Sequence, residues 1–196
     1  MLVAKLDKAL AAGGRIRLSR ALSAELRIIE PGRTTMLAQG LESLERLKSG
    51  KRAGDYGLLA RGDEIASLAS FYAVLGPFHD GKWDKPEGSS MGDLGADRLS
   101  HVRARVLAPA NAKVVSSGIS SQSATIAAGD AGLRRETLIR AAMVRDFALL
   151  VSSRFESASR KVGDVEVRSH FVERDKEAGA RVLEAAASSL ATYEKL

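Results

Sequence analysis

From residue 12 onward, apolar and polar side chains mostly alternate along the chain, and this is the period of a β-strand. The segment HVRARVLAP (101–109) places Val102, Ala104 and Val106 on one face and its basic residues on the other. The segment DVEVRSHFV (164–172) alternates in the same way. Both segments are therefore predicted to be strands with one apolar face.

A further alternating segment and four short apolar runs bounded by turn residues are also predicted to be strands. These segments are residues 13–20, 112–118, 123–129, 135–143 and 146–153. Several short strands at near-regular spacing are typical of a mostly β protein. The expected fold is either a two-layer sandwich or a saddle-shaped sheet of short, mainly antiparallel strands, with a C-terminal α-helix.

Residues 175–195 break the two-residue period and are predicted to form this helix. Asp175 can cap its N-terminus, and apolar residues recur at steps of three and four. These residues are Val182, Leu183, Ala186, Leu190 and Tyr193. We expect a β-domain over residues 1–174 and a helix over residues 175–196, which either docks on the sheet or opens a following domain. Residues 1–11 are expected to be a short helix or a frayed start.

Charge and composition narrow the possible partners. The net charge is +6, but Lys and Arg are scattered among Asp and Glu, so no nucleic-acid partner is predicted. No apolar run has the length of a membrane span, and we expect no signal peptide at the start. The chain has no cysteine, which excludes disulfides and thiolate metal sites. The compartment stays open.

The motifs of common hydrolytic and nucleotide-binding sites are absent from the sequence. It contains no H-E-x-x-H zinc motif, no G-x-S-x-G elbow and no Walker sequence. His101 and His170 lie on the polar faces of predicted strands and are expected to be solvated. His79 lies in a turn, where it either caps a backbone N–H or has a catalytic or metal role. No catalytic or metal-binding residue is therefore assigned.

The segment GDEIASLASFYAVLGPFHDGKWDKPEG (62–88) concentrates the aromatic and turn-forming residues of the chain. Its aromatic side chains either line the rim of a substrate site or pin a long turn onto the sheet. The candidate rim or domain-interface residues are Phe71, Tyr72, His79 and Trp83, together with Tyr193 of the helix.

Four segments also follow one another in an order that is found in a known family. The aromatic loop, ending in Trp83 and Asp84, is followed by a strand and turn over 106–118, the sequence VRDFA at 144–148, and the final helix. This order resembles the N-terminal β-domain of aminopeptidase N-like (gluzincin) zinc metallopeptidases, most closely their bacterial branch. The chain departs from the family at Ala73, where the loop commonly has Pro.

The resemblance implies that these 196 residues form one wall of an active-site cleft, while zinc and the catalytic groups belong to a catalytic domain that is absent from this chain. The intact enzyme would hydrolyse N-terminal peptide bonds, so its partners would be peptide substrates and the remainder of its own polypeptide. The chain alone is expected to be inactive and to bind no cofactor. The alternative is a stand-alone β-sandwich binding or interaction module with no enzymatic role.

Overall fold

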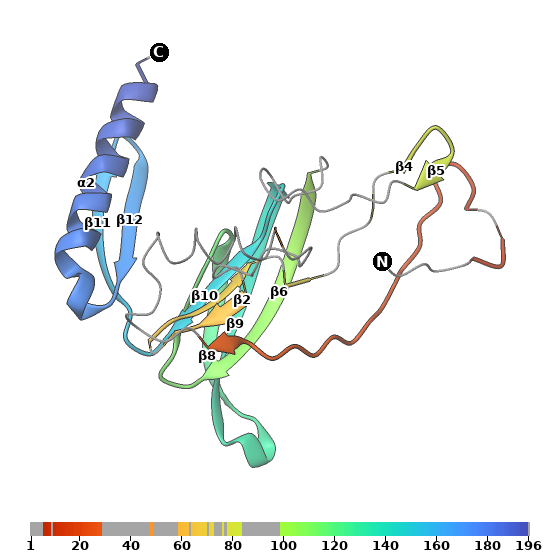
Figure 1. The fold of residues 1–196 in the computed structure, drawn as a ribbon, viewed down its shortest axis with the longest axis horizontal. Helices are drawn as coiled ribbons and strands as arrows, with labels where there is room; N and C mark the ends of the chain where they lie inside the picture. Colours follow the sequence, from red (N-terminus) through yellow and green to blue (C-terminus); the bar gives the residue numbers. More distant parts are fainter. Residues whose placement is uncertain are drawn as a thin grey trace.

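The computed structural model describes residues 6–8, 10–28, 48, 59–62, 64–69, 71–72, 76, 78–83 and 99–195. In these residues the chain is mostly β, with mainly antiparallel sheets and a C-terminal α-helix (Figure 1). The predicted fold class is thus confirmed.

A three-stranded antiparallel sheet carries the longest strands. Its order is β6 (Ser100–Pro109), β9 (Leu133–Val144) and β8 (Ile119–Ala127), and a short 3₁₀ turn, η1 (Gly129–Ala131), joins β8 to β9. Val102 pairs with Ala141 and Ala104 pairs with Ile139, so the apolar positions of β6 and β9 share one face. The alternation predicted for 101–109 is confirmed.

A second sheet has five shorter strands. Their order is β1 (Arg27–Ile28), β2 (Leu59–Arg61), β3 (Ala66–Ala69), β10 (Ala148–Ser152) and β7 (Lys113–Ser116). Neighbouring strands are antiparallel except β1 and β2, which are parallel.

The core lies between these two sheets. Its buried residues are Ile139 and Ala141 of β9, Leu149 of β10, and Phe147 just before β10. Half-buried apolar residues of β3, β6 and β7 pack around them. The two sheets therefore form the two layers of a sandwich.

A third unit combines a hairpin with the helix. Strands β11 (Glu156–Val162) and β12 (Val165–Phe171) pair through a two-residue turn in which Gly163 has a φ of 54°. A 3₁₀ turn, η2 (Glu173–Asp175), then leads into helix α2 (Lys176–Tyr193), which lies along the hairpin (Figure 1).

A small hairpin at the other end of the molecule joins β4 (Phe78–His79) and β5 (Lys82–Trp83). Its turn residues Asp80 and Gly81 have φ values of 49° and 76°. Two consecutive positive φ values define the turn that matches the twist of paired strands, and an Asp-Gly sequence favours it.

Several local predictions were wrong. Residues 13–20 form no strand; Ile16 and Leu18 are 47% and 61% exposed, and alternation yields a strand only where a neighbour supplies hydrogen bonds. For residues 1–11 only the helix alternative was wrong, since the described part is not helical, and the frayed start stays a prediction. Strand β11 was missed because its sequence, ESASRKV, has few apolar residues.

Much of the aromatic loop, including Ala73, Pro77 and Asp84, lies outside the described residues.

Candidate functional site

Phe71 and Tyr72 of the predicted rim form an aromatic cluster against the core. Their ring centroids are 5.4 Å apart with an interplanar angle of 76°, and each ring lies 6.4 Å from that of buried Phe147. The Phe147 N–H donates a hydrogen bond of 3.0 Å to the Tyr72 hydroxyl. These contacts anchor the start of the aromatic loop to the core. For Phe71 and Tyr72 this corresponds to the second alternative of the sequence analysis, in which the aromatic residues pin a turn onto the sheet.

The other three candidates lie elsewhere. His79 and Trp83 pair with Lys82 and Phe78 in the β4–β5 hairpin, and their side chains are outside the described part of the structure. Tyr193 is 72% exposed near the end of α2. Because α2 and the β4–β5 hairpin occupy opposite ends of the molecule (Figure 1), the five candidates do not form one site.

Helix α2 packs on the β11–β12 hairpin through small and aliphatic residues. Gly179 and Ala187 are buried and Leu183 and Leu190 are half-buried, all on one side of the helix. Only part of the predicted apolar stripe is packed, since Val182 and Tyr193 lie outside the packed face. The missing side chain of Gly179 lets the helix approach Phe171 of β12 closely.

A second face of α2 is uncharged and exposed, and we call it the open face of α2. Val182 is 61% exposed and Tyr193 is 72% exposed. Helical spacing places four small exposed residues beside them. The open face comprises Ala178, Val182, Ala185, Ala186, Ser189 and Tyr193. An exposed helix face without charge is typical of a surface that packs against another element.

A charged junction connects the five-stranded sheet to the helical unit. Glu64, between β2 and β3, accepts a hydrogen bond of 2.6 Å from Arg154 Nη1. Its other oxygen lies 3.3 Å from Arg174 Nε in η2 but accepts no hydrogen bond. No sequence signal links Glu64 to Arg154, because they are 90 residues apart.

Two further carboxyl groups line an open cleft of about 440 Å³ at this junction. The carboxyl of Glu156 shares a hydrogen bond with Glu173, and this bond raises the pKa of Glu156, with smaller contributions from burial and the Glu173 charge. Lys176 and Lys113 oppose the increase in pKa. The hydrogen bond and the like charge of Glu173 both favour the neutral form of Glu156.

The geometry of the ionisable side chains bears on metal binding. Within the described residues, no three His, Asp or Glu side chains are grouped so that they could hold a metal ion.

No helix in that part of the chain is both long and apolar enough to cross a lipid bilayer.

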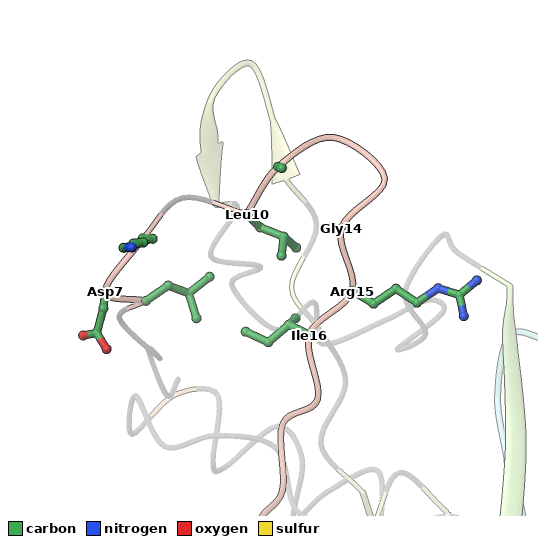
Figure 2. Close-up of a pocket in the computed structure, with 8 residues that line it drawn as sticks. Asp7, Leu10, Gly14, Arg15 and Ile16 are labelled. Atoms are coloured by element: carbon green, nitrogen blue, oxygen red, sulfur yellow. The ribbon is translucent and has the colours of Figure 1, made fainter.

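A hollow of about 570 Å³ lies in the N-terminal segment (Figure 2). Leu10 and Ile16 point toward it, whereas the charged ends of Asp7 and Arg15 point away in opposite directions (Figure 2). Since ligand sites combine apolar walls with converging polar groups, this arrangement does not define one.

His170 of β12 was predicted to be solvated, but its side chain is partly buried. Its ring lies 6.2 Å from that of buried Phe155, and its Nδ1 is buried without a hydrogen-bond partner. Burial lowers the pKa of His170, and the charges of Arg168 and Lys113 lower it further. His101, by contrast, is exposed as expected.

The chain matches no protein-family model, no curated protein and no solved structure.

Proposed function

We propose that this chain is the non-catalytic N-terminal β-domain of an aminopeptidase N-like zinc metallopeptidase, and that it forms one wall of the active-site cleft. The observation that carries the proposal is the open face of α2, which is exposed and uncharged. A following domain would bury this face and gain roughly 25 cal/mol for each Å² of apolar surface removed from water.

The order of segments supports the same assignment. The strand-and-turn region 106–118 spans the end of β6, all of β7 and the turn before β8, and the VRDFA segment 144–148 leads from β9 into β10. Helix α2 follows directly after these strands, at the place where the family's catalytic domain opens. The proposal assigns zinc and peptide-bond hydrolysis to that other domain and no catalytic step to the residues of this chain.

Sequencing the DNA downstream of the Leu196 codon tests the proposal. We expect an open reading frame that continues into an H-E-x-x-H motif. The protein expressed from that frame should cleave aminoacyl reporter substrates only when zinc is present, and the present chain alone should not cleave them. A frame without the motif, or zinc-dependent cleavage by the present chain, would contradict the proposal.

A matched pair of substitutions tests the role of α2 in the longer protein. Val182→Asp places a charge on the open face and should impair association with the catalytic domain. Ser188→Asp adds the same charge on the exposed, charged side of the helix that carries Glu177, Arg181 and Glu184, and serves as the control. Limited proteolysis should separate the two domains in the Val182 variant and not in the control. Equal protease resistance in both variants would contradict the claim that the open face of α2 packs against the catalytic domain.

The second candidate function is a stand-alone interaction module. The packing of Gly179 and Ala187 on the β11–β12 hairpin favours this candidate, because it gives α2 a partner within the chain. A reading frame that stops after Leu196, together with a single cooperative unfolding transition of the purified chain, would support the module over the enzyme domain.

A further inference from the structure

The β6–β9–β8 sheet has a second, outer face, opposite the core. Successive side chains of a strand point to opposite sides, so the residues of β6 and β9 between the buried positions point to this outer face. Their cross-strand partners on β8 point to the same side. The outer face presents four arginines and two exposed aliphatic residues. These are Arg103, Arg105, Arg134, Arg140, Leu107 and Ile119. We refer to this surface as the outer arginine face.

Arg103 and Arg140 lie directly opposite each other on β6 and β9, and both are exposed. Side chains at such paired positions are close enough to interact, and two like charges there are destabilising. No carboxylate among the described residues forms an ion pair with either of them, whereas neighbouring Arg105 pairs with Glu136. These two like-charged positions are therefore not neutralised by any carboxylate of the described residues.

Apolar surface accompanies the positive charge. Ile119 pairs with Arg140 across β8 and β9 and is 79% exposed, and Leu107 on β6 is 51% exposed. Arginine is enriched at protein interfaces, and exposed aliphatic side chains are stabilised when a partner covers them. The guanidinium group also binds carboxylates through two parallel hydrogen bonds.

We propose that the outer arginine face binds an acidic segment of a protein partner. A carboxylate of the partner bridges Arg103 and Arg140, and its aliphatic side chains cover Ile119 and Leu107. The net charge of +6 adds a long-range attraction for such a segment. The six side chains of this face include no aromatic ring on which a nucleic-acid base could stack, so a protein partner fits better than a nucleic acid.

The test measures binding of a fluorescent peptide in which Glu and Leu alternate, by anisotropy at low and physiological salt. The unmodified chain should bind this peptide, and the double variant Arg103→Gln, Arg140→Gln should lose about a hundredfold in affinity, about tenfold for each charge-assisted contact. The matched control is the double variant Arg160→Gln, Arg181→Gln, which removes two exposed arginines from the helical unit and should leave the affinity unchanged.

Thermal unfolding separates a binding role from a structural one. Removing the like-charge pair should raise the Tm of the double variant by about 1 to 2 °C while its binding falls. The proposal is overturned if the peptide does not bind, if the control loses the same affinity, or if the double variant loses binding together with stability. Tighter binding of single-stranded DNA or of phosphatidylserine vesicles through the same arginines would also overturn it.

Discussion

The ring of Phe171 on β12 lies directly against the backbone of Gly179 in α2. A Cβ atom added at Gly179 would lie 2.6 Å from Cγ and 2.9 Å from Cβ of Phe171. Phe171 is only 9% exposed, so its ring has little room to move away. Helix α2 can therefore lie this close to the hairpin only because residue 179 is a glycine.

Gly179→Ala tests this contact. Alanine favours the helix by about 1 kcal/mol, but the clash with Phe171 costs about 1–3 kcal/mol and should dominate. We expect the free energy of unfolding to fall by about 1 kcal/mol in urea titrations. In a double-mutant cycle with Phe171→Ala, the penalty of Gly179→Ala should shrink, because the Cγ and ring atoms that the new methyl group meets are gone. A stabilised Gly179→Ala variant would contradict this packing.

Tyr72→Phe tests the anchor of the aromatic loop. The variant removes the acceptor for the Phe147 N–H, and the free energy of unfolding should fall by about 1 kcal/mol. Tyr193→Phe is the matched control, since Tyr193 is 72% exposed, and it should leave stability unchanged. Equal stability of both variants would show that the hydroxyl contributes nothing to the anchor.

Glu64→Gln tests the charged junction. The Glu64 side chain is 12% exposed, so removal of its charge leaves Arg154 and Arg174 without their shared partner. Both arginines are more than half exposed, so solvent limits the expected loss to about 1–2 kcal/mol. Glu177→Gln breaks an exposed pair with Arg181 and should change stability by less than about 0.5 kcal/mol. If both variants lost a similar free energy of unfolding, Glu64 would contribute no more to stability than an exposed ion pair does.

His170 should make folding sensitive to mildly acidic pH. Its folded-state pKa is lowered, first by burial and then by Arg168 and Lys113, so the unfolded chain binds its proton more readily. The stability that neutral His170 contributes is present above the pKa of an unfolded-state histidine, about 6.5, and is lost as pH falls through the lower folded-state pKa. NMR titration should give a lower midpoint for His170 in the native protein than in urea, and Lys113→Gln should raise the native midpoint. An unchanged midpoint on unfolding would contradict the burial of this ring.

Local sequence patterns were sufficient to predict much of the secondary structure. The alternation of Val102, Ala104 and Val106 predicted both the strand and its buried face, because successive side chains of a strand point to opposite sides. The helix over 175–195 was also predicted nearly to its ends, from an apolar stripe and its acidic first turn. The same pattern failed at 13–20, where the described structure has no neighbouring strand to pair with.

The candidate surfaces depended on tertiary structure. The aromatic candidates could be listed from sequence, but only the fold assigned Phe71 and Tyr72 to the core and Tyr193 to an exposed helix face. The junction at Glu64 and the arginine pair on β6 and β9 join residues far apart in the chain, and no local pattern encodes such pairings. Sequence alone determined where β6, β9, β12 and helix α2 form, because hydrophobic periodicity acts over a few neighbouring residues. Tertiary structure decided which faces are covered and which charges meet, because strand register and close packing bring distant segments together.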